Sequence, residues 1–320
     1  MEPLLELKNV KKYFPVSAGR MLHAVDNINL TIPKGATLGL VGESGCGKST
    51  LGRLCIRLLE ATEGEIHFEG ADLRKLNKKQ LHQKRADMQM IFQDPLACLN
   101  ARRNVYELIS EPLTLNPDYW GVLSKDDITK KVIDLMDTVG LSKRFINSYP
   151  HELDGGRRQR IGIARALAVN PKFIVCDEPV SALDVSIQAQ ILNLLMDLQK
   201  EMELTYLFIT HNLSVVKHIS SEIAVMYLGQ CVEKAPADEL FSNPLHPYTK
   251  ALLDAIPVPR LEYRDKTSVI RGEISNPIDP KPGCRFAPRC DHCSEACLNH
   301  DCRFRDMGGG HYVACTLFES

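Results

Sequence analysis

One short segment constrains the fold more than any other part of the chain. It matches the pattern G-x-x-x-x-G-K-[ST] of a phosphate-binding loop. Glycines let backbone N–H groups turn toward phosphate oxygens, the lysine places a positive charge between the outer phosphates, and the following hydroxyl can ligate magnesium. The pattern therefore predicts a site for a nucleoside triphosphate. The segment consists of Gly42, Glu43, Ser44, Gly45, Cys46, Gly47, Lys48, Ser49 and Thr50.

The residues on either side of the loop support this interpretation. Residues 36–41 (ATLGLV) form a short apolar run that predicts a buried strand. After the loop, apolar residues recur with helical spacing and predict one buried helix face. The positive end of that helix would face the phosphates. The apolar positions are Leu51, Leu54, Cys55, Leu58 and Leu59.

A second apolar run supplies the acids that a triphosphate site needs. Residues 173–176 (FIVC) predict a buried strand that ends in Asp177-Glu178-Pro179. A carboxylate at the end of a strand beside a phosphate loop can organise magnesium. The following glutamate can orient or deprotonate an attacking water. Asp177 and Glu178 are therefore candidate magnesium-binding and catalytic residues.

Composition and charge exclude several classes of protein. The hydrophobic fraction is 44% and the charged fraction 25%, which excludes disordered and fibrous chains. Lysine and arginine total 39 against 40 acids, so no global positive field favours nucleic acid. At 320 residues, the length predicts about two domains. No apolar run is long enough to span a bilayer, so any membrane role must come through a partner.

Further motifs follow in an order that points to one family. Gln93 lies in MIFQDP, and Ser181-Ala182-Leu183-Asp184 follows Pro179 at short spacing. An apolar strand is predicted at 207–210 and ends at His211, while residues 153–160 (LDGGRRQR) precede a helical run. In these motifs, over residues 1–240, the chain resembles the ATP-binding subunits of ABC transporters. The resemblance implies an α/β fold, a P-loop ABC ATPase domain with a mixed sheet core and a helical subdomain at about 95–165.

The resemblance also implies a role for each motif. Residues 42–50 correspond to the Walker A loop, Asp177 to the Walker B aspartate and Glu178 to the catalytic glutamate. Gln93 corresponds to the glutamine that contacts magnesium, and His211 to the histidine that supports the γ-phosphate. Magnesium would be held by Ser49, Gln93 and Asp177. The aromatic residue that stacks on adenine is Tyr13 or Phe14, and the spacing from Val10 favours Phe14.

The signature loop departs from the family pattern Leu-Ser-Gly-Gly-Gln. Here Asp154 replaces the serine, Gly155 and Gly156 are kept, and Arg157 replaces the glutamine. In the family this loop contacts the γ-phosphate bound by the opposite subunit of a dimer. At an effective dielectric of about 20, two like charges 4 Å apart repel by roughly 4 kcal/mol. We therefore expect a heterodimer in which the site that receives Asp154 is weak. The competing interpretation is a homodimer that tolerates Asp154 in both sites.

The C-terminal part of the chain resembles one group of ABC transporter ATPases in particular. His246-Pro247-Tyr248 and the apolar-periodic run after it are similar to the extension, here 241–320, of oligopeptide, dipeptide and nickel importer ATPases. This implies an ATP-hydrolysing subunit that powers peptide import, peripheral on the cytoplasmic face of the cell membrane. Its expected partners are a second ABC ATPase subunit, two transmembrane permease subunits and an extracytoplasmic substrate-binding protein, with no nucleic acid. The alternatives are an importer of nickel or another small chelate, a soluble ABC ATPase acting on ribosomes or DNA, and a regulatory nucleotide binder.

Six of the 11 cysteines lie within residues 284–320. In a reduced compartment this density favours a metal over disulfides. Spacing alone would suggest zinc bound by Cys290, Cys293, Cys297 and Cys302. The resemblance to peptide-importer ATPases instead implies a [4Fe–4S] cluster, with Cys293 and Cys302 left over. A tail without metal is the third possibility. The ligands implied by the resemblance are Cys284, Cys290, Cys297 and Cys315.

Overall fold

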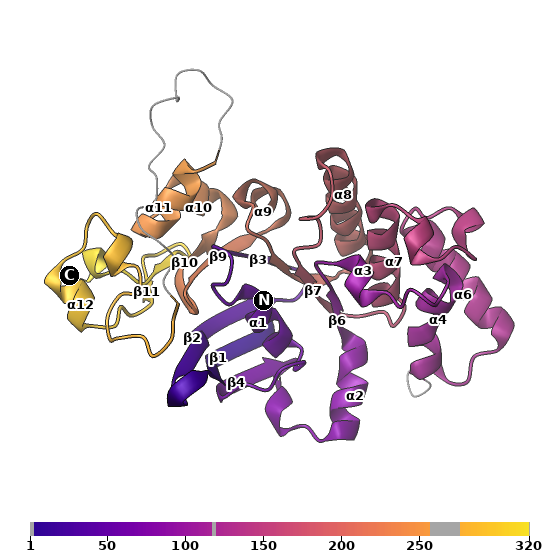
Figure 1. The fold of residues 1–320 in the computed structure, drawn as a ribbon, viewed down its shortest axis with the longest axis horizontal. Helices are drawn as coiled ribbons and strands as arrows, with labels where there is room; N and C mark the ends of the chain where they lie inside the picture. Colours follow the sequence, from indigo (N-terminus) through magenta and orange to yellow (C-terminus); the bar gives the residue numbers. More distant parts are fainter. Residues whose placement is uncertain (1–2, 117–119, 257–275, 320) are drawn as a thin grey trace, which may run out of the picture. The chain divides into compact units, whose positions relative to one another are not determined.

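The computed structural model describes residues 3–116, 120–256 and 276–319, and the chain divides in it into two units. The first unit contains Pro33–Ala36 and Lys75–Phe208, and the second contains Pro3–Ile32, Thr37–Arg74 and Ile209–Ser320. The second unit is discontinuous in sequence, because N-terminal strands, the phosphate loop and the C-terminal extension fold together in it. Figure 1 shows the elements of both units.

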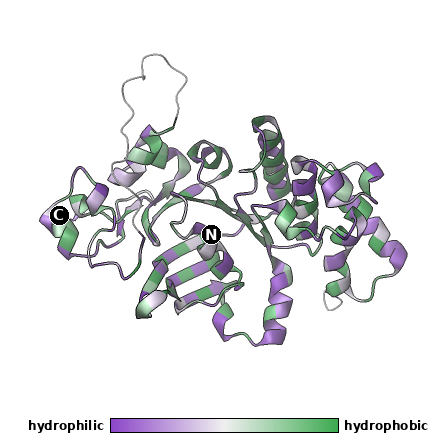
Figure 2. Cartoon of the chain, in the orientation of Figure 1, coloured by the Kyte–Doolittle hydropathy of each residue, from purple (hydrophilic) through white to green (hydrophobic). Residues whose placement is uncertain are grey.

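The second unit contains a four-stranded sheet in the order β2-β1-β4-β5. β1 pairs antiparallel with β4, and Leu5 lies opposite Phe68. Along these strands hydrophobic and hydrophilic residues alternate in stripes (Figure 2), as expected for a sheet with one buried face. The strands are β1 (Pro3–Pro15), β2 (Met21–Pro33), β4 (Glu63–Phe68) and β5 (Ala71–Asp72).

Five further strands of this unit follow the order β11-β12-β10-β9-β3. β3 and β9 are parallel whereas β9 and β10 are antiparallel, so the sheet is mixed. β3 is buried along its whole length, which confirms the strand predicted at 36–41. The strands are β3 (Thr37–Val41), β9 (Glu222–Tyr227), β10 (Gln230–Pro236), β11 (Arg305–Asp306) and β12 (Tyr312–Val313). The helices are α1 (Lys48–Cys55), α9 (Leu213–Ile219), α10 (Ala237–Ser242), α11 (Pro247–Asp254) and α12 (Glu295–Asn299).

The helix after the phosphate loop is shorter than its apolar pattern predicts. α1 ends at Cys55, and Leu58 is 47% exposed, so the prediction of Leu58 on the buried face is wrong. The backbone turns at Arg57, whose φ is +51°. The N–H of Arg57 donates to the Leu54 carbonyl and that of Leu58 to the Arg53 carbonyl. This is a Schellman motif, which normally has glycine at the turning residue.

The first unit contains three strands in the order β8-β7-β6 and a group of helices. β6 and β7 are parallel, and β7 is fully buried, which confirms the strand predicted at 173–176. α4, α6 and α7 pack against one another (Figure 1). The strands are β6 (Met88–Ile91), β7 (Phe173–Asp177) and β8 (Thr205–Ile209). The helices are α2 (Lys78–Asp87), α3 (Pro95–Cys98), α4 (Val105–Leu115), α6 (Lys125–Thr138), α7 (Gly155–Leu167) and α8 (Val185–Met202).

A buried carboxylate on β10 joins the parts of the C-terminal extension. Glu233 has no exposed surface, and its oxygens accept the backbone N–H groups of Leu245 at 2.7 Å and His246 at 2.9 Å. Nε2 of His311, itself 3% exposed, lies 2.7 Å from the same carboxylate. The ring of His246 accepts the Tyr248 N–H at 3.0 Å and so caps α11. The His-Pro-Tyr motif is therefore a helix start bound to a buried acid.

An aromatic cluster forms the core beneath this extension. The rings of Tyr227, Tyr248 and Phe286 lie within 5.3 Å of one another by centroid. All three residues are buried, and buried side chains of β9 and β10 belong to the same cluster. Among the described residues, no helix is both long enough and apolar enough to cross a membrane.

We predict that Gly64→Ala destabilises the second unit more than Gly70→Ala does. Gly64 has φ +90° at an irregularity in the β1–β4 register, and a Cβ there would lie 2.3 Å from the Asn9 carbonyl oxygen. Gly70 has φ +76° with no atom within 4 Å of that position. We expect losses of about 3 kcal/mol for Gly64→Ala and about 1 kcal/mol for Gly70→Ala in urea unfolding followed by circular dichroism. Equal losses would show that the close contact has no effect.

Candidate functional site

The phosphate loop joins β3 to α1 and depends on a glycine at its last turn. Gly47 is the N-cap of α1 with φ +104°. A Cβ at this position would lie 2.0 Å from the carbonyl oxygen of Ala24. Only glycine combines that backbone conformation with so close an approach. The loop is therefore pressed against β2 on one side while α1 begins on the other.

The lysine of the loop is buried and oriented by main-chain oxygens. Lys48 is 5% exposed, and its Nζ donates to the carbonyl oxygens of Gly42 at 2.7 Å and Glu43 at 2.9 Å. Cys46, inside the loop, is 1% exposed, and burial raises the pKa of its thiol. The carbonyl of Cys46 accepts the N–H of Gly229 at 2.8 Å. The loop is thus held from within by Lys48 and from outside by the β9–β10 turn.

Every polar group of Glu43 is engaged. Its N–H donates to the hydroxyl of Tyr248 at 2.9 Å, and its carbonyl accepts from Lys48. Its carboxylate accepts both terminal nitrogens of Arg289, at 2.7 and 3.0 Å. Arg289 also donates to the hydroxyl of Tyr227 at 3.3 Å. Two residues of the C-terminal extension therefore contact the second residue of the phosphate loop.

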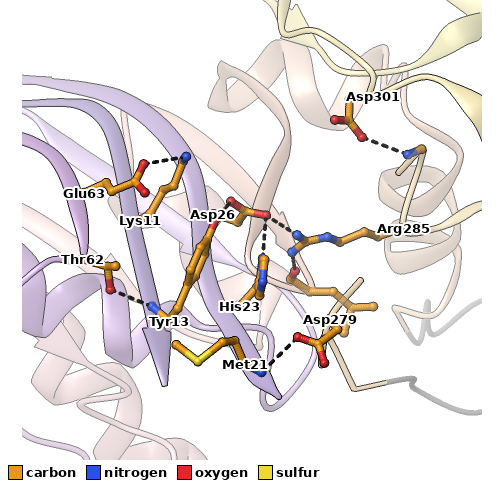
Figure 3. Close-up of polar contacts among 12 residues, drawn as sticks. Lys11, Tyr13, Met21, His23, Asp26, Thr62, Glu63, Asp279, Arg285 and Asp301 are labelled. Atoms are coloured by element: carbon orange, nitrogen blue, oxygen red, sulfur yellow. Dashed lines mark hydrogen bonds and ion pairs between the residues drawn. The ribbon is translucent and has the colours of Figure 1, made fainter. Parts of the chain in front are cut away.

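The two candidate adenine-stacking residues have different surroundings. Tyr13 stacks on His23 with ring centroids 3.8 Å apart, and its hydroxyl donates to Asp26 at 2.6 Å (Figure 3). Neighbouring residues of a strand point to opposite faces, so Phe14 lies on the other side of β1. Nζ of Lys12 lies 5.0 Å from the centre of the Phe14 ring. The face of Tyr13 is thus already occupied by His23.

Asp26 is the centre of a polar network that reaches the C-terminal extension. Its carboxylate accepts from Tyr13 and from Arg285, and lies 3.4 Å from Nδ1 of His23 (Figure 3). Burial alone would raise the pKa of Asp26. The hydrogen bond from Tyr13 and the charge of Arg285 outweigh that effect and hold the pKa below its usual value. Burial and the hydrogen bond to Asp26 raise the pKa of Tyr13.

The candidate magnesium-binding and catalytic acids lie in the first unit. Asp177 ends β7 and is 3% exposed. Glu178 follows with φ +46°, a conformation that non-glycine residues adopt rarely and often at functional sites. Nε2 of Gln93 donates to a carboxylate oxygen of Glu178 at 3.1 Å. The structure therefore brings Gln93 and Glu178 together at the end of β7.

His211 lies in the second unit, two residues after the end of β8. It is exposed, between two residues whose side chains fix the local backbone. The hydroxyl of Thr210 accepts the N–H of Asn212 at 3.0 Å, and Asn212 in turn caps α9. The histidine is therefore presented at a defined turn between a strand and a helix.

The signature loop has a local explanation for both of its unusual residues. Asp154 is the N-cap of α7 and accepts the N–H of Arg157 at 2.8 Å, as a serine would. Its other carboxylate oxygen accepts the Arg157 guanidinium at 2.6 Å. That guanidinium also lies over the ring of Phe145 at 4.7 Å. Asp154 and Arg157 thus form a pair without net charge.

Five of the six tail cysteines line two cavities, and Cys284 lines both. One small cavity is lined by all four cysteines that the resemblance implied, together with the apolar walls of Phe286 and Leu317. Cys302 lines a different, larger cavity, and Cys293 is exposed. Within the described ranges, no three His, Cys, Asp or Glu side chains are gathered closely enough to hold a metal ion. The described residues therefore do not form a coordination sphere for the expected metal. The four cysteines that line the small cavity are Cys284, Cys290, Cys297 and Cys315.

Comparison with known proteins assigns the chain to a family. A family model described as "ABC transporter" matches residues 25–181, and one described as "Oligopeptide/dipeptide transporter, C-terminal region" matches residues 232–297. The oligopeptide transport ATP-binding protein OppF of Bacillus subtilis is 51% identical over 320 residues, covering 99% of this chain and 98% of that protein. The chain belongs to the ATP-binding proteins of ABC transporters. It is accordingly an ATPase.

Other relatives of this ABC ATPase agree with the assignment. The dipeptide transport ATP-binding protein DppF of Escherichia coli is 45% identical, covering 98% of this chain and 94% of that protein. Among solved structures, a dimeric ATP-binding cassette in a post-hydrolysis state with ADP and phosphate has a TM-score of 0.67 at 31% identity. That match covers 73% of this chain and 98% of the solved one. The fold expected from the sequence, an α/β ABC ATPase with a mixed sheet, is confirmed.

Sequence reasoning missed several residues of this ABC ATPase that surround the nucleotide loop. Asp26, Arg285 and Arg289 form ion pairs between segments far apart in the chain, and no local pattern identifies them. The sequence offered one signal for the two arginines. Arg285 and Arg289 lie in the cysteine-bearing stretch on which the family resemblance was based. The expected motif residues are divided between the units. Gln93, Asp154, Asp177 and Glu178 lie in the first unit, whereas the phosphate loop, Phe14, His211 and the six tail cysteines lie in the second.

Proposed function

We propose that this chain hydrolyses ATP to power the import of oligopeptides or dipeptides. The observation that carries this proposal is the full-length similarity to oligopeptide and dipeptide transport ATP-binding proteins, which includes the C-terminal region. The buried, oriented lysine of the phosphate loop gives the similarity a chemical basis. Peptides are the substrates named for these relatives, and they are the cargo we assign to this chain.

In the proposed site the phosphate loop and Phe14 bind the nucleotide. Backbone N–H groups of residues 42–50 contact the phosphates, and Lys48 neutralises the charge of the outer ones. Phe14, whose neighbour Tyr13 is turned to the other face of β1, stacks on adenine. Asp154, Gly155 and Gly156 contact the triphosphate held by an opposing ATPase subunit.

Magnesium would be held by Ser49, Gln93 and Asp177. These residues fit the ion, because all three offer oxygen donors of the kind that magnesium prefers. When bound, the ion supplies positive charge to the triphosphate oxygens. Glu178, oriented by its hydrogen bond from Gln93, positions and deprotonates the attacking water. His211 supports the γ-phosphate from the turn after β8.

We predict that Glu178→Gln binds ATP with near-normal affinity but loses hydrolysis by about 100-fold or more, because the amide cannot accept the proton of water. Lys48→Ala should lose ATP binding itself, since no other side chain of the loop carries a positive charge. Binding is measured by titration with a fluorescent ATP analogue, and hydrolysis by phosphate release. Glu201→Gln, which removes an exposed glutamate of α8, is the control and should change neither. Hydrolysis by Glu178→Gln at the normal rate would contradict the assignment.

We further propose that the chain works as one half of an ATPase heterodimer with a related subunit. The proposal rests on Asp154, which would face a triphosphate bound by the partner. The ion pair with Arg157 reduces the repulsion expected for a lone carboxylate, yet the serine hydroxyl of the family pattern is still missing. One composite ATP site would therefore be weaker than the other.

We predict that Asp154→Ser raises ATP hydrolysis of the mixed complex by about twofold, as a second site becomes active. Serine keeps the N-cap of α7, so thermal stability should change little. Hydrolysis is measured for the chain alone and together with a related ATPase subunit. Asp126→Ser, which replaces an exposed acid in the first turn of α6, is the control. An unchanged rate in both settings would exclude the asymmetry.

The proposed organisation follows the family resemblance. Residues 1–240 form the ABC domain, with a helical subdomain at about 95–165 that contacts the membrane subunits, and residues 241–320 form the extension. The partners are two transmembrane permease subunits and an extracytoplasmic substrate-binding protein. The chain is then a peripheral subunit on the cytoplasmic face of the cell membrane.

For the tail we propose a [4Fe–4S] cluster held by the four cysteines that line one cavity. Their thiols are suitable ligands, and the cavity wall is otherwise largely apolar, which suits a cluster shielded from water. The zinc set suggested by spacing includes Cys293 and Cys302, which do not line that cavity. When bound, the cluster would supply iron–sulfur bonds that pin the loops of the tail.

We predict that anaerobically purified chain is coloured and contains about four iron atoms per chain, as a [4Fe–4S] cluster requires. Cys290→Ser should lose iron and visible absorption, because it removes a ligand. Cys293→Ser, an exposed cysteine three residues away, is the matched control and should keep both. If the protein is colourless and contains one zinc per chain, the tail binds zinc and not the cluster. If it is colourless and contains no metal, both metal hypotheses are wrong.

A further inference from the structure

The C-terminal extension reaches the phosphate loop through one residue. Glu43 is bound at its N–H by Tyr248, at its carbonyl by Lys48 and at its carboxylate by Arg289. Tyr248 and Arg289 both belong to the extension, 205 and 246 residues further along the chain. Glu43 is therefore fixed from outside the loop, and the loop's lysine is fixed to Glu43.

We propose that Arg289 is a positioning residue of the ATP site, which acts through Glu43 on Lys48. This inference rests on the proposed ATPase function. Arg289 does not belong to the loop, and its role is to hold the Glu43 main chain so that Lys48 and the loop N–H groups converge on the phosphates. The C-terminal extension thereby sets the affinity of the chain for nucleotide.

The geometry of the Arg289–Glu43 pair suits such a role. The guanidinium donates from both terminal nitrogens, and a bidentate pair fixes orientation as well as distance. The Arg289 side chain is 6% exposed and that of Glu43 18%, so solvent weakens the pair less than it does a surface ion pair. Lysine could replace the charge of Arg289 but not its planar pair of donors.

A second contact from the same segment supports the loop independently. Arg285 donates to the carbonyl of Leu228, in the turn between β9 and β10. The next residue, Gly229, donates its N–H to the Cys46 carbonyl at 2.8 Å. Arg285 also binds Asp26 on β2. Asp26 in turn accepts a hydrogen bond from Tyr13 on β1 (Figure 3). The segment 283–290 thus touches the surroundings of the loop at two points.

A simpler role for Arg289 would be to cancel the negative charge of Glu43 beside a triphosphate. The two roles predict opposite effects of Glu43→Ala. If the arginine only neutralises a charge, removal of the carboxylate should leave ATP binding unchanged or tighter. If the pair positions the loop, the same change should weaken binding, because the Glu43 main chain loses its tether.

The test measures the dissociation constant for ATP, and KM and kcat for hydrolysis, on the full-length chain. We expect Arg289→Gln to weaken ATP binding by about tenfold, which corresponds to about 1.4 kcal/mol of binding free energy, with kcat changed by less than about twofold. Arg289→Lys should be intermediate. Glu43→Ala should resemble Arg289→Gln, and the double variant should be no weaker than either single one. Arg305→Gln, which removes a more exposed arginine of the same extension, is the matched control and should bind normally.

Several outcomes would overturn the proposal. These are normal ATP affinity in Arg289→Gln, tighter binding in Glu43→Ala, additive losses in the double variant, or an equal loss in Arg305→Gln. If Arg289→Gln lowers the melting temperature, Arg289→Lys and Glu43→Ala carry the test, since both keep the aromatic core beneath. Lys48→Ala separates this inference from the proposed function. Normal ATP binding by Lys48→Ala refutes the ATP site itself, whereas loss there beside an unaffected Arg289→Gln refutes only the positioning role.

Discussion

A carboxylate with no exposed surface determines where the C-terminal extension lies. A buried charge costs several kcal/mol unless it is paired and hydrogen-bonded. Glu233 meets that requirement only when the loop at Leu245 and His246 and the strand start at His311 are both in place. The segments at Glu233, at Leu245 and His246, and at His311 are thus held together by one carboxylate. Tyr248, two residues after the loop contact, is thereby brought to the phosphate loop.

Local patterns were enough to predict the parts of the site that lie along one stretch of chain. The strands before the phosphate loop and before Asp177 are short apolar runs, and both exist as predicted because burial on both faces demands such runs. The loop motif specifies its own glycine geometry, as Gly47 illustrates. The exchange of serine for Asp154 is visible in the sequence, whereas its pairing with Arg157 depends on how the start of α7 places both side chains.

Other features depend on contacts that sequence patterns do not encode. The early end of α1 follows from a left-handed Arg57, where the usual signal would be glycine. The partner of Tyr13 is Asp26, on a neighbouring strand, and strand pairing is not readable from one sequence. The bond between Arg289 and Glu43 spans 246 residues. An ion pair between residues so far apart in the chain produces no repeating sequence pattern, because it specifies the residue type at only one position in each segment.

The order of residues in the segment 283–290 joins two kinds of chemistry. Arg285 directly follows Cys284, and Arg289 directly precedes Cys290. Successive Cα atoms are about 3.8 Å apart, so the stretch of backbone that carries each of these cysteines also carries the neighbouring arginine. A bidentate pair such as that of Arg289 tolerates little displacement before one of its bonds is lost. The backbone positions of Cys284 and Cys290 are therefore set together with those of Arg285 and Arg289, so the loop that presents thiols to the small cavity is the same loop that braces the nucleotide site.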